Sequence, residues 1–304
     1  MSTQVAAPRG VYAKQIPERR RKTGRRAARI AGRVVLYTVL TLGSVVMLLP
    51  LAWMLSTASK PLDEAIAPVF IPFPSKFMLI ENVISAFGHA PIATFFKNSA
   101  IVASCVVVGD IILASLSGYS FAKFNYPGRS LLFTMVLATM MIPGFVVIIP
   151  LYVVVYRFGW LNSYQGLIIP GLVGAFSIFL MRQWMLTIPS ELLDAARIDG
   201  ASEPYIYARI VMPMSRPAIA TLAIFTFGAN WDSYIWPLLV VSEKSMFTVP
   251  LGLTYFKSQS FGQWQTLWNE LMAVAIVAQI PTFMVFFVFQ RQFIQGMHLS
   301  GLKG

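Results

Sequence analysis

Six long apolar runs, separated by more polar segments, dominate the hydropathy pattern of this chain. They cover residues 34–55, 99–121, 130–155, 164–181, 218–241 and 271–290. A helix needs about 20 apolar residues to cross the hydrocarbon core of a bilayer. The runs therefore predict an all-α, polytopic membrane protein with six transmembrane helices. The third run contains Pro143 followed by Gly144, which predicts a break in that helix.

The segment between the first two runs, residues 56–98, is rich in proline and balanced in charge. This pattern predicts an ordered but irregular cap on the outer side of the membrane. A short amphipathic stretch lies within it, near Glu81–Phe87.

Composition agrees with a membrane protein and excludes a pair of soluble domains. Of the 304 residues, 57% are hydrophobic and only 12% are charged, whereas ordinary globular domains have about 25% charged residues. The only cysteine is Cys105, which excludes an intrachain disulfide and a multi-cysteine metal site. His89 and His298 are far apart and neither lies in an HExxH pattern, so no metal site is expected.

The net charge of +12 is concentrated at the N-terminus. Residues 1–33 contain ten Lys or Arg and one acid, Glu18, so this tail carries +9. Nucleic acid is one conceivable partner of such a tail. We favour a cytoplasmic basic tail that meets anionic lipid and no nucleic acid, because a hydrophobic helix follows it directly. That helix has 22 uncharged residues, too many for the roughly 7–15 of a cleaved signal peptide.

The loops show a clear positive-inside bias. With the N-terminus inside, eighteen Lys and Arg lie in inner segments and six lie in outer segments. This distribution predicts that both termini are cytoplasmic. The chain then divides into a basic tail, 1–33, and a transmembrane domain, 34–304, with a cytoplasmic loop at 182–217.

Polar groups inside the apolar runs are candidates for a substrate path, because charged groups are costly in lipid and tend to face the bundle interior. Interhelical hydrogen bonding is favoured for Asp110, next to Gly109, while packing and substrate contact are equally open for Asp232. A sugar is recognised by hydrogen-bonding groups together with an aromatic face. The candidate path residues are Asp110, Asn230, Trp231, Asp232 and Tyr234.

The chain lacks the chemistry of an enzyme or of an ATPase. Gly296–Gly301 resembles a phosphate-binding loop only in part, because Leu302 separates the second glycine from Lys303 and no hydroxyl residue follows. No GxSxG elbow is present and no catalytic residue can be named. A self-sufficient secondary transporter and a membrane-embedded enzyme remain as alternative hypotheses.

The segment Arg182–Pro217 is long for an inner loop, and its four arginines balance four acids. Ser190 is predicted to cap a helix that starts at Glu191. Gly200 is predicted to end this helix in a left-handed conformation. Ser202 would then cap a second helix that ends at the two prolines of the segment, Pro213 and Pro217.

Two features of the first loop helix suggest a docking surface. Asp194 and Arg197 are three residues apart and can pair on its surface. Ala195 and Ala196 have small side chains, so they form a smooth patch that a partner can approach closely. The alternative is a loop helix that is merely solvated.

These residues resemble a known motif. Asp194-Ala195-Ala196-x3-Gly200-x9-Ile210-x2-Pro213 is similar to the EAA loop of ABC importer permeases, with Asp194 in place of Glu and Met212 in place of Leu. Further segments resemble the carbohydrate-uptake branch, which includes the smaller permease of the maltose transporter. They are Ile149–Tyr152, Gly166–Pro170, Trp236–Leu238 and the C-terminal Gln295–Gly304.

The resemblance covers the chain after residue 34 and implies a type I ABC importer fold in a prokaryotic plasma (inner) membrane. It implies that the loop docks onto a separate ATPase, which binds and hydrolyses ATP with Mg²⁺, while this chain binds no cofactor. Its other implied partners are a second permease and an extracytoplasmic substrate-binding protein, and its implied cargo is a carbohydrate or related polyol. The implied docking residues are Glu191, Asp194, Ala195, Ala196, Arg197, Asp199, Gly200, Ile210 and Pro213.

Overall fold

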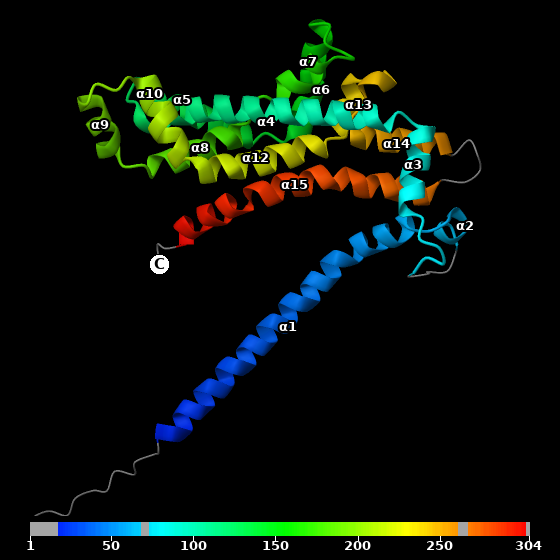
Figure 1. Ribbon diagram of the computed structural model, residues 1–304. Helices are drawn as coiled ribbons and strands as arrows, with labels where there is room; N and C mark the ends of the chain where they lie inside the picture. The colour runs from blue at the N-terminus through cyan, green and yellow to red at the C-terminus, as the bar shows by residue number, and fades with distance from the viewer. Residues whose placement is uncertain (1–17, 68–72, 261–266, 302–304) are drawn as a thin grey trace, which may run out of the picture. The chain divides into compact units, whose positions relative to one another are not determined.

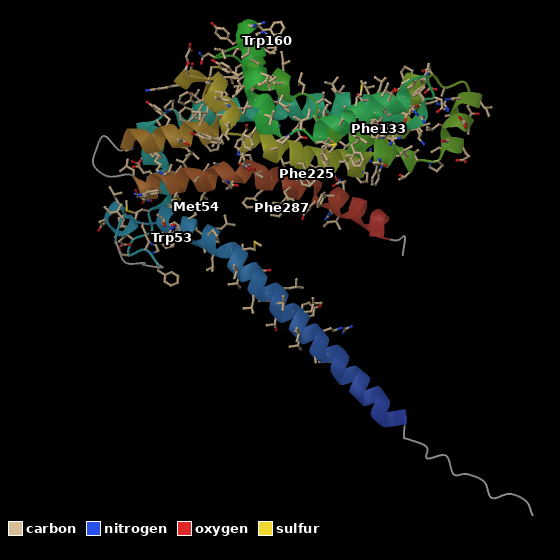
Figure 2. All side chains as sticks on the ribbon, turned by 180° about the vertical axis from the view of Figure 1, so that it is seen from behind. Trp53, Met54, Phe133, Trp160, Phe225 and Phe287 are labelled. Atoms are coloured by element: carbon tan, nitrogen blue, oxygen red, sulfur yellow. The ribbon has the colours of Figure 1, made fainter. Side chains whose placement is uncertain are left out.

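The computed structural model describes the backbone of residues 18–67, 73–260 and 267–301. Side chains are described from residue 30 onward, except at 68–72, 258–266 and 295–304. Most of the basic tail and His298 therefore lie outside the described side chains. The chain divides into two units, one ending at Trp53 and the other beginning at Met54; both residues are labelled in Figure 2.

Helices account for the regular structure throughout the described ranges (Figure 1). The first part contains α1 (Glu18–Ala58), α2 (Leu62–Ala65), α3 (Leu79–His89), α4 (Ile92–Lys123), α5 (Arg129–Met140), α6 (Gly144–Arg157), α7 (Tyr164–Ile168), a 3-10 turn η1 (Ile169–Gly171) and α8 (Ala175–Leu186). The second part contains α9 (Ser190–Ile198), α10 (Glu203–Ile206), a π-helical turn η2 (Tyr207–Val211), α11 (Met212–Met214), α12 (Arg216–Trp231), α13 (Ile235–Val240), a 3-10 turn η3 (Lys244–Met246), α14 (Val249–Ser260) and α15 (Trp268–Gly301).

Six membrane spans are compatible with the lengths and apolarity of these helices. Three are single helices, Ile30–Ala58, Ile92–Lys123 and Trp268–Ile294. Three are bent pairs, with 102° between α5 and α6, 41° between α7–η1 and α8, and 74° between α10–α11 and α12. The break predicted at Pro143 is confirmed, since Pro143 separates α5 from α6 and occupies the N-cap position of α6.

The fifth span differs from the prediction of one helix over 218–241. It ends at Trp231, and a new helix, α13, begins at Ile235. Pro237 supplies the physical reason, because in a continuous helix it would remove the hydrogen bond to residue 233 and clash with that carbonyl. In α13 the proline lies in the first turn, where no such bond is needed.

In the unit of residues 54–304, α4, α8, α12 and α15 run side by side (Figure 1). Helices α9 and α10 lie at one end of this bundle, and α3 and α14 lie at the other (Figure 1). Each end has its own buried apolar cluster. One surrounds Phe95, Trp231 and Phe247, and the other surrounds Met181 and Leu193.

Gly118 allows α4 and α8 to pack closely. A Cβ atom at this position would lie 2.8 Å from the Met181 Cβ and 2.9 Å from the Arg182 backbone nitrogen. Small residues at such crossings let membrane helices approach each other closely. This contact matters for the site because α4 and α8 carry the side chains that meet the loop and the polar cluster.

Candidate coupling loop and intramembrane polar cluster

Helix α9 begins one residue earlier than predicted. Ser190 is its first residue, Pro189 occupies the N-cap position, and no side chain caps the helix. The prediction that the Ser190 side chain caps this helix is therefore wrong. The proline ring explains the change, because it fixes φ at −59° and the residue adopts ψ 131°, which turns the chain into the helix without a capping side chain. Glu191 lies in the first turn, where its charge suits the helix dipole.

The end of α9 confirms the predicted left-handed glycine. Gly200 has φ +83°. The Gly200 nitrogen donates to the Arg197 carbonyl at 3.0 Å, and the Ala201 nitrogen donates to the Ala196 carbonyl at 2.9 Å. These two bonds are the Schellman pattern, which satisfies carbonyls left free at a helix C-terminus. The chain is thereby turned sharply from α9 into α10.

Arg197 joins α9 to α10. Its Nη1 donates to Asp194 Oδ1 at 2.6 Å, which confirms the predicted pair, and its Nε donates to Glu203 Oε1, also at 2.6 Å. Hydrogen bonds to Glu203 and then Asp194 raise the pKa of the Arg197 guanidinium above its ordinary value. The cation is therefore shared between two carboxylates.

Glu203 extends this link to the membrane bundle. Its Oε2 accepts a hydrogen bond from the Tyr119 hydroxyl of α4 at 2.9 Å. Neither Glu203 nor Tyr119 is among the site residues predicted from the sequence. Glu203 has a weak signal in the sequence. It follows the Gly200 turn closely enough for the Arg197 side chain to reach it when the chain folds back. Tyr119 has no such signal, because it lies 84 positions away along the chain.

The two faces of α9 divide the predicted alanine patch. Leu193 is buried and Ala196 packs against the same apolar cluster, so Ala196 faces its own bundle. Ala195 is exposed, as are Leu192 at 43% and Ile198 at 86%. The prediction that Ala195 and Ala196 form one surface patch is therefore wrong, because consecutive residues point about 100° apart on a helix. The exposed apolar face consists of Leu192, Ala195 and Ile198, with the exposed Glu191 and Asp199 beside it.

The second loop helix also differs from the prediction. Ser202 occupies the N-cap position of α10, but its side chain makes no capping bond. Pro213 lies inside α11, two residues after the π turn Tyr207–Val211, and the helix ends at Met214, between Pro213 and Pro217 as predicted. The wider π pattern carries the chain past a residue that has no N–H to donate. Ile210 packs against the apolar cluster around Met181.

Asp110 is the centre of a polar cluster that joins three helices. It is 2% exposed. Its Oδ2 accepts from the Ser177 and Thr226 hydroxyls, each at 2.7 Å, and its Oδ1 accepts from the Gly174 nitrogen at 3.3 Å. These bonds connect α4 with the start of α8 and with α12. This is the arrangement that interhelical packing requires of a buried carboxylate.

Thr226 connects Asp110 to one further candidate. The Asn230 Nδ2 donates to the Thr226 carbonyl at 2.8 Å, so Asp110, Thr226 and Asn230 form a continuous polar chain. Asp232 is not inside a helix as predicted. It is the exposed C-cap residue of α12, because the helix ends at Trp231. Tyr234 is half-buried and packs against the apolar cluster around Phe95.

Trp231 is occupied by packing. It is 2% exposed, and its Nε1 donates to the Ala278 carbonyl of α15 at 2.8 Å. Its ring stacks on Phe227, with the centroids 5.5 Å apart, and meets Phe96 of α4 edge-on at 6.0 Å. In this conformation the indole has no open face for a sugar ring, contrary to the sequence-based expectation. It ties α12 to α4 and α15.

A family match identifies the kind of protein to which this loop and polar cluster belong. Residues 110–299 match the model of the family described as binding-protein-dependent transport system inner membrane component. The chain belongs to this family. The matched range begins at Asp110 and includes both the α9 loop and the α12–α13 break.

Curated relatives of this permease are transport permeases. It is 30% identical over 276 residues to the arabinooligosaccharides transport system permease protein AraQ of Halalkalibacterium halodurans, covering 89% of this chain and 98% of the relative. It is 34% identical to the sn-glycerol-3-phosphate transport system permease protein UgpE of Salmonella typhi, covering 86% and 94%.

A solved structure shares the permease fold. It is a chain of a bacterial ABC transporter involved in the import of the acidic polysaccharide alginate, with a TM-score of 0.78. The sequence identity is 21%, and the match covers 88% of this chain and 98% of that chain. The all-α, importer-like fold expected from the sequence is therefore confirmed.

Proposed function

We propose that this permease is one of two membrane subunits of an ATP-driven importer, and that α9 docks onto a separate ATPase. The exposed face of α9 carries this proposal. Leu192, Ala195 and Ile198 offer an apolar surface next to two acids, which suits a groove with an apolar floor and a basic rim. The folding of this chain alone does not explain why Ile198, an apolar residue, is 86% exposed.

The inward contacts of α9 explain how docking would reach the membrane. Leu193 and Ala196 pack against the cluster that includes Met181 of α8, and Arg197 reaches Tyr119 of α4 through Glu203. A force on α9 is therefore passed to two membrane helices through packed and hydrogen-bonded side chains. Packed interfaces of this kind transmit a displacement because they are close-packed.

The sequence of this chain contains no phosphate-binding loop, so the complex needs a separate subunit that hydrolyses ATP. We assign ATP and Mg²⁺ to an ATPase dimer, with a second homologous permease completing the path. An extracytoplasmic binding protein delivers the substrate, in keeping with the family description. Both termini lie in the cytoplasm in this arrangement, as the Lys and Arg distribution favours.

We assign the cargo to the carbohydrates and polyol derivatives. AraQ and UgpE are named for an arabinooligosaccharide and for sn-glycerol-3-phosphate, and both substrates are rich in hydroxyl groups. Asn230, Asp232 and Tyr234 lie within five residues of one another at the α12–α13 break, where the helix is interrupted. Irregular backbone at membrane depth is tolerated where it lines a cavity, so we place the substrate contacts of this chain at the break.

The docking assignment predicts that Ala195→Trp abolishes stimulated ATP hydrolysis and uptake, because an indole cannot enter a packed groove. Ala195→Ser is the matched control and keeps both activities. The measurement is uptake and ATPase activity of the complex purified through the tagged permease. Ala196→Trp is a poorer probe, because Ala196 packs inside its own bundle.

Three results would contradict the proposal. Wild-type activity of the Ala195→Trp complex would remove α9 from the docking surface. Uptake by the permease in liposomes without an ATPase would favour a secondary transporter. Retained uptake by Asn230→Ala, Asp232→Ala and Tyr234→Ala would remove the break from the substrate path.

A further inference from the structure

Helix α3 has its polar face turned toward the protein. Asn82 is buried. Its Nδ2 donates to the Ala58 and Lys60 carbonyls at 2.8 and 2.9 Å, and its Oδ1 accepts from Asn269 Nδ2 at 2.9 Å. One polar side chain of α3 thus joins the end of α1 to the start of α15.

Glu270 of α15 binds the same face of α3. It is 6% exposed. Its Oε1 accepts from the Ser85 hydroxyl at 2.7 Å, and its Oε2 lies 2.8 Å from His89 Nδ1. Asn82, Ser85 and His89 are separated by three and four residues, so they lie along one face of the helix. The polar groups on that face make hydrogen bonds within the chain, although Ser85 and His89 remain exposed at its edges.

The opposite face of α3 is apolar and exposed. Ile80 is 68% exposed, Ile84 is 67% exposed and Phe87 is 42% exposed. The spacing i, i+4 and i+7 places them in one stripe, here called the α3 stripe. Phe77, just before the helix, is 63% exposed as well. A helix surrounded by water has the reverse arrangement, with its apolar stripe inward and its polar face outward.

The position of α3 indicates what covers the stripe. Helices α4 and α15 contain apolar segments long enough to span a membrane. In Figure 1, α3 runs across the ends of these two helices instead of along them. A helix placed in this way lies roughly in the plane of the bilayer, close to its surface. Interfacial helices bury their apolar face about 5–10 Å into the boundary between headgroups and acyl chains.

We propose that α3 is an interfacial helix whose stripe, Ile80, Ile84 and Phe87, inserts into the lipid leaflet at the α3 end of the bundle. Lipid fits better than a protein partner, because the stripe contains no charged or polar group to give a protein interface its specificity. The exposed Lys76 lies just before the helix, and its ammonium group can reach a lipid phosphate. The Asn82 and Glu270 bonds then fix the depth of α3 relative to α15.

Spin labelling tests this proposal on the assembled complex in vesicles of phosphatidylethanolamine and phosphatidylglycerol. Cys105→Ala provides a background without cysteine. Single cysteines replace Ile80, Ile84 and Phe87 in turn, so that poor expression of one variant leaves two others. Glu81→Cys, beside the stripe on the same helix, is the matched control. Collision rates are measured with oxygen, which concentrates in lipid, and with a nickel chelate, which stays in water.

At the three stripe positions we expect oxygen collisions to exceed nickel collisions several-fold, with a clearly lower ratio at Glu81→Cys. Nickel collisions in excess at the stripe would place it in water, as a docking surface for a soluble partner, and overturn the proposal. Low collision rates with both reagents would place the stripe against another subunit and also overturn it. None of these outcomes depends on the identity of the cargo or on the docking role of α9.

Discussion

Arg197 shows how one residue can hold a loop in place. It bridges two carboxylates, but the two bonds are not equivalent. The Asp194 side chain is 61% exposed and the Glu203 side chain 40% exposed. Exposed ion pairs contribute about 0–1 kcal/mol, because water and salt screen them. Glu203 also accepts from Tyr119, so the Glu203 bond connects the loop to the bundle while the Asp194 bond stays within α9.

Replacing Glu203 should therefore loosen α9 and α10 more than replacing Asp194. We expect amide hydrogen exchange across Ser190–Ile206 to be faster in Glu203→Gln than in the wild type. Asp194→Asn, which changes charge in the same way on the more exposed partner, should have a smaller effect. Equal exchange rates in the two variants would show that the Tyr119 link does not restrain the loop.

Asp110 shows how a single buried carboxylate can set the packing of several helices. The residues that it binds lie 64 to 116 positions away along the chain. In the membrane interior, groups without a hydrogen-bond partner find no water to replace it. The carboxylate therefore holds α4, α8 and α12 in one relative position, next to the α12–α13 break.

At this junction Asp110→Ala should destabilise the permease, because the Ser177 and Thr226 hydroxyls lose their acceptor. Leaving a buried group unpaired costs about 1–3 kcal/mol. Asp110→Asn keeps one carbonyl oxygen and should cost less. Thermal unfolding of the purified complex measures both effects. An unchanged melting temperature together with lost uptake would instead assign Asp110 to substrate binding.

The close crossing of α4 and α8 makes a second prediction for these elements. Gly118→Ala should lower the melting temperature, because overpacking a fitted contact costs about 1–3 kcal/mol. Gly228→Ala is the matched control: it lies inside α12, and a Cβ there meets no described atom within 4 Å. Helix propensity alone favours alanine by about 1 kcal/mol at such a site. An equal response of the two variants would mean that the α4–α8 distance is adjustable.

For the molecule as a whole, the charge distribution sets how the chain enters the membrane. Residues 1–33 carry +9, and α1 begins within this tail, at Glu18. The positive-inside effect depends on Lys and Arg close to the membrane. Four arginines, Arg25, Arg26, Arg29 and Arg33, lie nearest to the apolar part of α1.

Deleting residues 2–24 should accordingly leave topology and uptake intact, because these four arginines remain. Replacing the same four with asparagine in the shortened chain should produce mixed or inverted insertion. Protease accessibility of tags at the two termini measures orientation, and uptake measures function. Lost uptake by the deletion variant with normal insertion and assembly would give the tail a partner of its own.

Local sequence determined the features that depend on a few neighbouring residues. The six apolar runs predicted the spans, since crossing a bilayer requires only length and apolarity. Pro143 predicted the break between α5 and α6, and Gly200 predicted the left-handed end of α9, since both depend on φ at one residue. The Asp194–Arg197 pair followed from helical spacing.

Tertiary structure decided which side of each helix is in contact and with what. Three features could not be predicted from the sequence: the different environments of Ala195 and Ala196, the burial of Trp231 against Ala278, and the contact of Tyr119 with Glu203. It detected the amphipathic stretch of α3 but not that its polar face turns inward to Asn269 and Glu270. In a membrane protein apolar residues suit both lipid and core, so hydropathy does not fix helix rotation. Rotation is fixed by the packing and hydrogen bonds of residues far apart in the chain.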